Sequence, residues 1–297
     1  MIPQEIMQKI RRIHIRTRRM VNEILAGQYE SVFKGQGMEF REVRAYVPGD
    51  DIRSIDWNVT ARTGEPHVKI MAEEREMTVM LVVDMSGSGR FGSVSRFKNE
   101  LAAELCAVLA ASAIKNNDKV GLIIFTDDIE LYVPPKKGSR HVLRVIREVL
   151  YFTPRGTGTD IAKALGYLGR VMHRKAVVFL VSDFMAQGYE IALRATKRRH
   201  DVIAVTVTDP RELVLPDIGR VAVRDAESGI ETLVNTSDPR VRTAYERAAQ
   251  QRQRQRDEIL RRNRVDTLHT TTDKPYVEEI YRFFKMRERR RAGRAAV

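Results

Sequence analysis

Short runs of consecutive apolar residues recur along the middle of the chain and alternate with longer stretches of mixed polarity. The runs cover residues 78–83, 120–125, 176–181 and 202–207, and they are rich in β-branched side chains. Such runs are too short to span a membrane and are typical of strands buried on both faces. The pattern therefore predicts four central strands, with a shorter strand over residues 129–133 beside the second.

Apolar residues at helical spacing fill the stretches between these runs. They predict helices over residues 96–116, 140–150, 160–173 and 190–199. Buried strands that alternate with helices are typical of α/β proteins. We therefore expect an α/β fold with a doubly wound, mostly parallel central sheet.

The alternating strands and helices, together with the elements before and after them, divide the chain into three predicted segments. Residues 1–77 form an N-terminal extension, with a helix over 4–26, strands over 40–47 and 67–72, and the turn Pro48-Gly49-Asp50-Asp51. Residues 78–237 form the core, which ends in a hairpin across Glu227-Ser228-Gly229. Residues 238–297 form a C-terminal extension that packs on the core, with helices over 239–263 and from 275 and a strand over 265–270. The only tryptophan, Trp57, is expected to tie the preceding turn to the core.

Composition narrows the class of protein. Of the 297 residues, 43% are hydrophobic, so a substantial core can form. The single cysteine, Cys106, excludes an internal disulfide, fits a reducing compartment and lies in an alanine-rich helical run that predicts a buried packing residue. No apolar stretch approaches the ~20 residues of a membrane-spanning helix, and the first residues lack the apolar part of a signal peptide. We therefore expect a cytoplasmic protein without a membrane span.

The charge is strongly basic and concentrated in the C-terminal extension. The formal net charge is +13, and residues 240–297 hold 17 Lys or Arg against 8 Asp or Glu. These arginines spread around a predicted helix instead of lining one face. The distribution favours a solvated helix or a surface for an acidic protein partner over a nucleic-acid surface.

Oxygen-bearing side chains gather where the predicted strands end. Asp84, Ser86 and Ser88 follow the first apolar run at alternate positions, Asp183 follows the third, and Thr159 precedes a helix. Ligands of doubly wound sheets bind beyond the carboxyl ends of the strands. Oxygen ligands suit a hard divalent cation, Mg2+ or alternatively Mn2+ or Ca2+. We expect the three hydroxyls to bind the cation and the two carboxylates to hold its waters, which leaves room for a carboxylate from a partner protein.

Common nucleotide-binding and hydrolase motifs are absent from the sequence. It contains no G-x-x-x-x-G-K-[ST], no G-x-S-x-G and no H-E-x-x-H. Two residues after Asp84, where a phosphatase with an aspartyl nucleophile would carry a second acid, the chain has Ser86. No nucleophile or proton-transfer group is identified. The pattern therefore predicts adhesion through a metal in a protein that is not an enzyme.

Three alternatives remain open at the level of sequence. A metal-dependent phosphoesterase would use Asp127 and Asp128 together with Asp84 and Asp183. The basic C-terminal helix would bind nucleic acid. Alternatively, the serines of the first loop and Asp183 would only cap helices and shape loops.

The residues of the candidate site resemble a known motif. Asp84-Met85-Ser86-Gly87-Ser88, with Thr159 and Asp183 at later positions, is similar to the metal-ion-dependent adhesion site of von Willebrand factor A domains. The resemblance implies a doubly wound, mostly parallel sheet of that type. It also implies a metal held by Asp84, Ser86, Ser88, Thr159 and Asp183.

Segments outside the site narrow the resemblance. Residues 46–57, then Thr60-Ala61-Arg62, Arg199-His200-Asp201-Val202 and Asp209-Pro210-Arg211-Glu212, resemble a bacterial family known as domain-of-unknown-function family fifty-eight. That family is similar to von Willebrand A proteins whose genes neighbour MoxR-type AAA ATPases. The resemblance implies an adaptor that works with such an ATPase in the maturation or remodelling of other proteins, and a client protein that offers an acidic side chain.

Overall fold

The chain forms two compact units. The structure, a computed structural model, describes residues 29, 38–73, 76–94 and 96–295. One unit is Phe33–Met77, and the other combines Met1–Val32 with Thr78–Val297. The predicted helix over residues 4–26 lies outside the described residues. The larger unit holds both the stretch predicted as a core and the stretch predicted as a C-terminal extension.

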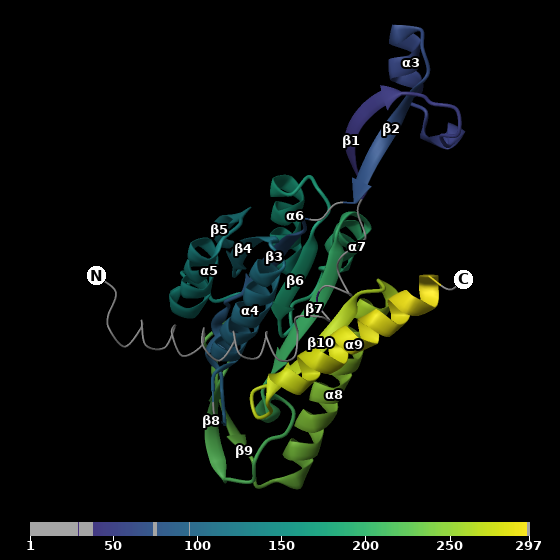
Figure 1. The fold of residues 1–297 in the computed structure, drawn as a ribbon. Coiled ribbons are helices and arrows are strands. Elements are labelled where there is room, and N and C mark those ends of the chain that lie inside the picture. Colours follow the sequence, from purple (N-terminus) through teal and green to yellow (C-terminus); the bar gives the residue numbers. More distant parts are fainter. Residues whose placement is uncertain (1–28, 30–37, 74–75, 95, 296–297) are drawn as a thin grey trace. The chain divides into compact units, whose positions relative to one another are not determined.

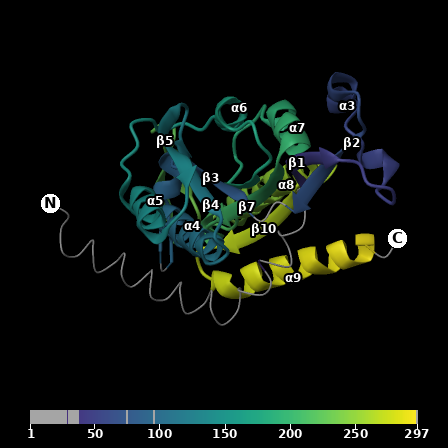
Figure 2. The same ribbon diagram turned by 45° about the horizontal axis from the view of Figure 1, so that its top comes forward.

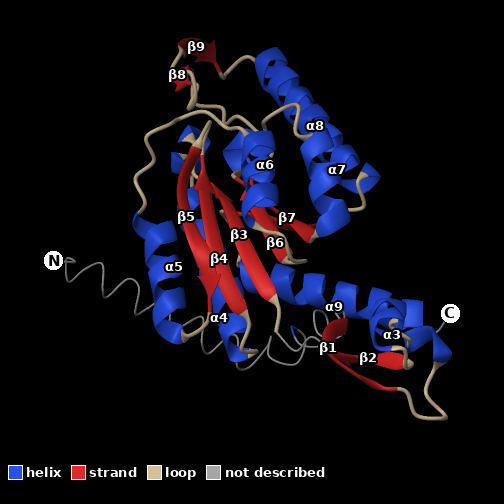
Figure 3. Ribbon diagram, turned by 90° about the horizontal axis from the view of Figure 1, so that it is seen from above, coloured by secondary structure: helices blue, strands red, loops and turns tan. Residues whose placement is uncertain are grey.

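A six-stranded sheet forms the centre of the larger unit (Figure 1). Its spatial order is β10-β7-β6-β3-β4-β5. All neighbours are parallel except β5, which runs antiparallel to β4 at one edge. The strands are β3 Thr78–Asp84, β4 Lys119–Phe125, β5 Ile129–Lys136, β6 Val177–Ser182, β7 Asp201–Thr208 and β10 Asp266–Thr271. Figure 3 shows β3 to β7 side by side in red.

Helices cover both faces of this sheet. Figure 2 shows α6 and α7 on one side of the strands and α4 and α5 on the other. The helices of the unit are α4 Lys98–Lys115, α5 Ser139–Tyr151, α6 Ile161–Val171, α7 Glu190–Arg199, α8 Pro239–Arg262 and α9 Tyr276–Ala295. The predicted α/β class and the doubly wound, mostly parallel sheet are confirmed.

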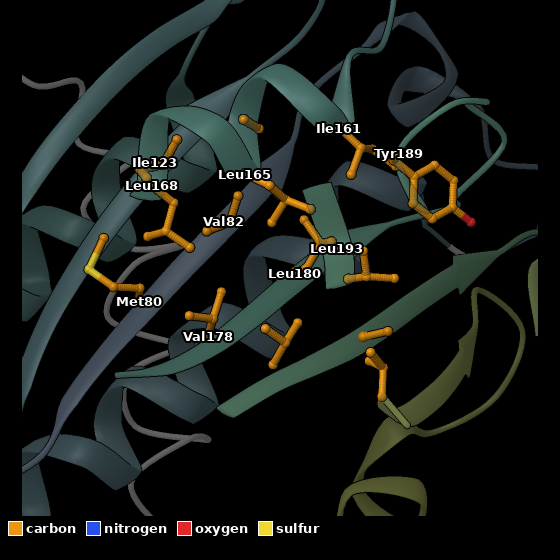
Figure 4. Packing of buried hydrophobic residues seen from close by; sticks show 14 of the residues in the cluster. Met80, Val82, Ile123, Ile161, Leu165, Leu168, Val178, Leu180, Tyr189 and Leu193 are labelled. Atoms are coloured by element: carbon orange, nitrogen blue, oxygen red, sulfur yellow. The ribbon is translucent and has the colours of Figure 1, made fainter. Parts of the chain in front are cut away.

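The central strands are buried on both faces, as their unbroken apolar runs predicted. In β3, the side chains of Val79 through Val83 have no exposed surface. Met80 and Val82 belong to the cluster that also includes Leu165 of α6 and Leu193 of α7 (Figure 4). Cys106 of α4 is buried as expected, and burial raises the pKa of its thiol to about 12, which keeps it protonated near neutral pH.

The C-terminal residues complete the sheet. β10 pairs in parallel with β7 from Asp266 opposite Ile203 to Thr271 opposite Thr208. Buried Asp209, just after β7, accepts hydrogen bonds from Thr272 and from the backbone nitrogen and hydroxyl of Ser93. The ends of β7 and β10 are therefore tied to the loop after β3.

The smaller unit is an antiparallel pair with a short helix. β1 Met38–Ala45 pairs with β2 His67–Glu73, and α3 Trp57–Thr63 lies between them in sequence. The prediction for Trp57 was wrong, because its side chain is 67% exposed. Polar contacts hold the turn instead: Asp50 accepts two hydrogen bonds from Arg44, at 2.6 and 2.8 Å, and Asp56 caps α3.

In the described part of the chain, no helix combines the length and apolar content needed to cross a bilayer.

A buried ion pair should make the stability of the larger unit depend on pH. Asp201 lies 2.6 Å from Arg287 of α9 and 3.1 Å from Lys197 of α7. Burial by itself raises the pKa of Asp201, but the charges of Arg287 and Lys197 outweigh it and hold the pKa below its ordinary value of 3.8. A carboxylate with a lowered pKa stabilises the fold above the pKa of the unfolded chain, and this stabilisation is lost as the pH falls through the folded pKa.

We therefore expect Asp201→Asn to lower the free energy of unfolding by about 2 kcal/mol near neutral pH, because Arg287 keeps Asp266 as a partner but loses one of its two carboxylates. The difference from wild type should shrink below pH 3.8. Urea unfolding followed by circular dichroism from about pH 7 to about pH 3 measures it. Asp273→Asn, the same change at an exposed position, should cost less than about 0.5 kcal/mol. A constant difference across this range would contradict the assignment.

Candidate metal centre

Two neighbouring parallel strands bring the predicted acids to one edge of the sheet. Asp84 is the last residue of β3, and Asp183 directly follows β6. β3 and β6 pair in parallel, with Val83 opposite Val181. The carboxyl ends of parallel strands meet at the same edge, so residues 99 positions apart in sequence become neighbours.

A chain of hydrogen bonds links four of the five predicted residues. Asp84 Oδ1 accepts from the backbone nitrogen of Ser86 at 3.0 Å. The hydroxyl oxygens of Ser86 and Ser88 are 3.1 Å apart, and Ser88 Oγ donates to Asp183 Oδ2 at 2.8 Å. The structure therefore brings Asp84, Ser86, Ser88 and Asp183 together.

Thr159 lies on an adjoining loop, and its hydroxyl contacts Glu227 instead of the four residues of this hydrogen-bonded chain. The two loops are tied because the backbone nitrogen of Gly87 donates to the carbonyl oxygen of Thr157 at 2.8 Å. Thr159 Oγ1 donates to Glu227 Oε1 at 2.8 Å, and Glu227 belongs to the turn between β8 Arg220–Arg224 and β9 Glu231–Asn235. The sequence analysis predicted Thr159 as a residue of the site. It predicted a turn at Glu227 but no contact between Glu227 and Thr159.

The serines do not cap the helix that follows them. α4 begins at Lys98, and the backbone nitrogen of Phe97 donates to the side chain of Glu100. Ser86 precedes the 3-10 helix Gly87–Arg90 without a side-chain capping bond. Capping of α4 is thus no explanation for these hydroxyls, whereas Asp183 does shape its own loop by accepting from the backbone nitrogen of Met185 at 3.0 Å.

A buried ammonium that the sequence did not reveal completes the cluster. Lys98 Nζ lies 2.6 Å from Asp183 Oδ2 and 2.6 Å from Glu212 Oε1, and the lysine side chain is 3% exposed. Burial by itself lowers the pKa of Lys98, but the charges of Asp183 and Glu212 outweigh it and hold the pKa above its ordinary value. Lys98 is the first residue of α4, a position without a sequence signal for a buried charge.

The carboxylates respond to this environment in different ways. Burial and the nearby charge of Asp183 raise the pKa of Asp84 to about 6. Burial also raises the pKa of Asp183, but the ammonium of Lys98 outweighs it and the net shift is downward. For Glu212, burial outweighs the attraction of Lys98, and the pKa lies above its ordinary value. The cluster thus holds three carboxylates and one ammonium, which contacts two of them, and it has an excess of negative charge.

This donor set fits a hard divalent cation. Among the described residues, no group of three or more His, Cys, Asp or Glu is arranged to hold a metal by itself, so a cation would depend on hydroxyl oxygens. Ser86, Ser88 and Thr159 could offer such oxygens. Asp84 and Asp183 could accept hydrogen bonds from bound waters, and their excess charge would be neutralised.

Ser182 belongs to the candidate site, whereas Asp127 and Asp128, the additional acids of the phosphoesterase alternative, have other partners. Ser182 Oγ donates to Asp84 Oδ2 at 2.6 Å and fixes that carboxylate; only its place beside Asp183 hinted at this role. Asp128 is 71% exposed in its side chain and pairs with Lys163 at 3.1 Å. Within the described residues, no hydrogen bond joins Asp127 or Asp128 to the acids of the candidate site.

A cavity of about 510 Å3 lies beside Asp183. Its lining includes Glu212 and Tyr189, together with Arg252 and Arg256 of α8. The basic helix predicted as a solvated element or a partner surface therefore forms part of the surroundings of the candidate site.

Comparison with known proteins places this chain in a family. A family model described as "Protein of unknown function DUF58" matches residues 42–256. The chain belongs to this family. An uncharacterised protein of Mycobacterium bovis is 33% identical over 283 residues, which cover 94% of this chain and 89% of that protein. An uncharacterised protein of Mycobacterium tuberculosis matches with the same identity and coverage.

The comparison with solved structures returned two Bacteroides proteins. The conserved hypothetical protein BatB from Bacteroides thetaiotaomicron has a TM-score of 0.48 and 18% identity, and the match covers 72% of this chain and 99% of that chain. An aerotolerance-related membrane protein from Bacteroides fragilis has a TM-score of 0.49 with the same identity and coverage.

Lys98→Met should change both the stability of the protein and its stabilisation by Mg2+. Removal of the ammonium leaves Asp183 and Glu212 without their buried partner, so we expect the free energy of unfolding without metal to fall by about 3 kcal/mol. The excess negative charge grows, so Mg2+ should stabilise the variant more than it stabilises wild type. Thermal unfolding with and without Mg2+ measures both effects. Lys136→Met, on the edge strand β5, serves as the exposed control, and an equal Mg2+ effect in all three proteins would contradict the prediction.

Proposed function

We propose that this protein binds a protein partner through a divalent cation held at the carboxyl ends of β3 and β6. The observation that carries the proposal is the hydrogen-bonded chain from Asp84 through Ser86 and Ser88 to Asp183. Ser86, Ser88 and Thr159 would hold Mg2+, or Mn2+ or Ca2+ in its place. When bound, the cation supplies an electropositive centre that a carboxylate can bind.

The surroundings of these side chains favour a binding role over catalysis. Ser86 and Ser88 contact each other and Asp183, and Asp183 in turn is held by Lys98. Both carboxylate oxygens of Asp84 accept hydrogen bonds within the cluster, one from Ser182 and one from Ser86. Hydroxyls and carboxylates that are held by hydrogen bonds in this way can orient the ligands of a cation. Catalysis would instead need a base placed beside a free nucleophile. We infer an adaptor and not an enzyme.

The proposed partners are a MoxR-type AAA ATPase and an acidic client protein. The support is the resemblance of the site and of the flanking segments to the family to which the chain belongs. Arg252 of α8, which is exposed and lines the cavity beside Asp183, adds a positive charge that suits an acidic protein. In this role the protein would connect the ATPase to proteins that it matures or remodels.

Asp84→Asn tests the cation site. The change removes one of the charges that should attract Mg2+, so we expect at least about a tenfold loss of affinity in isothermal titration calorimetry. Asp128→Asn, the same change at an exposed position outside the cluster, should leave the titration unchanged. Equal titrations for wild type and Asp84→Asn would exclude the proposed site.

The ATPase partnership needs a test that does not remove Mg2+, because the nucleotide site of an AAA ATPase itself uses this ion. We expect purified wild-type protein to bind the purified MoxR-type ATPase of the same organism in biolayer interferometry, and Asp84→Asn to bind at least about tenfold more weakly. Asp128→Asn again provides the matched control. Binding that is absent in wild type, or equal in all three proteins, would contradict this partnership at the metal centre.

A further inference from the structure

The tip of the β8–β9 hairpin lies against both loops of the candidate site. Thr159 Oγ1 donates to Glu227 Oε1 at 2.8 Å, and Thr157 Oγ1 donates to the backbone carbonyl oxygen of Glu227 at 3.1 Å. On the other loop, a Cβ at Gly87 would overlap the carbonyl oxygen of Ala226. Glycine at this position therefore allows the hairpin to approach the serine loop closely.

Hydrogen bonds inside the turn fix the place of Glu227. Asp225 Oδ1 accepts from the backbone nitrogen and the hydroxyl of Ser228, both at 2.7 Å, and from the backbone nitrogen of Glu227 at 3.2 Å. Gly229 has a φ of +73°, in the left-handed region, and its backbone nitrogen donates to the carbonyl oxygen of Asp225 at 2.9 Å. A preorganised turn therefore presents the carboxylate of Glu227 to Thr159.

The strands of the hairpin contribute little packing that would hold it in this position. Leu233 of β9 is 70% exposed, and Ile230, which directly precedes β9, is 67% exposed. A two-stranded hairpin by itself is marginally stable in water. The hydrogen bonds at the tip therefore contribute to the position of the hairpin against the two loops.

The contact brings together hydroxyl and carboxylate oxygens, which are the ligands that a hard cation prefers. Neighbouring oxygens around an octahedral Mg2+ are about 2.9 Å apart. The oxygens of Thr159 and Glu227 are separated by 2.8 Å, and the hydroxyl oxygens of Ser86 and Ser88 by 3.1 Å. Three neutral hydroxyls leave the charge of a cation uncompensated at close range, so a carboxylate is the favoured additional ligand.

We propose that Glu227 is the chain's own occupant of the candidate cation site, and that an acidic partner must displace it. This inference rests on the proposed function and adds its regulation. The hairpin closes the site until a competing carboxylate takes the place of Glu227. Because Glu227 is tethered, it competes at an effective concentration on the order of millimolar. The partner can bind only the molecules in which the hairpin is open. Its apparent affinity is therefore lower when a larger fraction of the molecules is closed.

Glu227→Gln keeps the size of the side chain and removes its charge. In wild type, Mg2+ should slow hydrogen exchange of the amides of residues 225–231, because the cation would tie the hairpin down; in Glu227→Gln this protection should be lost. At saturating Mg2+ for each protein, the variant should bind a fluorescein-labelled glycine peptide with one central Asp about five- to tenfold more tightly than wild type in fluorescence anisotropy. The same peptide with Asn measures binding that does not depend on the carboxylate.

Glu231→Gln, the same change on the exposed strand β9, is the matched control and should behave as wild type. Equal protection by Mg2+ in wild type and Glu227→Gln would overturn the inference and leave the proposed cation site standing. A wild-type protein that gives no heat with Mg2+ would overturn both. If neither protein binds the Asp peptide, the exchange measurement decides: lost protection in Glu227→Gln supports the inference, and retained protection overturns it.

Discussion

One buried ammonium allows three carboxylates to share an edge of the central sheet. Lys98 contacts Asp183 and Glu212 at 2.6 Å each, and Asp84 follows through the hydrogen bonds of the two serines. Without this cation, only neutral hydrogen-bond donors would offset the desolvation cost of burying the acids. The start of α4, the end of β6 and the 3-10 helix Pro210–Glu212 are thereby tied at one point. The negative charge that remains is what a divalent cation would neutralise.

The same cluster explains why a bound cation would select its protein partner by the carboxylate that the partner offers. The hydroxyls of the serine loop are neutral, and the acids behind them are occupied by hydrogen bonds within the fold. A carboxylate that approaches from outside therefore meets oxygens it can join around a cation, with little competing negative charge at the front. In the structure, Glu227 accepts a hydrogen bond from Thr159, and we propose that it takes this position. On the proposed function, capture of a partner becomes an exchange of one carboxylate for another.

The basic C-terminal residues are used partly inside the fold. β10 adds a parallel strand beside β7, and Arg287 of α9 pairs with both Asp201 and Asp266 at the start of these strands. On α8, Arg256 is 8% exposed and contacts Asp257. Charges that are paired in this way do not contribute fully to a long-range field. The net charge of the chain is therefore a weak guide to an acidic partner.

The sequence alone determined the fold class and the family, because both depend on local patterns. Strands buried on both faces are continuous apolar runs, and the alternation with helices followed directly from them. Asp84, Ser86 and Ser88 were visible because they follow one strand at alternate positions. Local pattern misplaced Trp57, since a hydrophobic side chain at the start of a short helix can as easily face the solvent. Only the tertiary structure decided which distant groups meet the site. Lys98 and Glu227 carry no sequence signal for these roles, because their contacts depend on how α4 and the β8–β9 hairpin dock on the sheet edge and not on their neighbours in the chain.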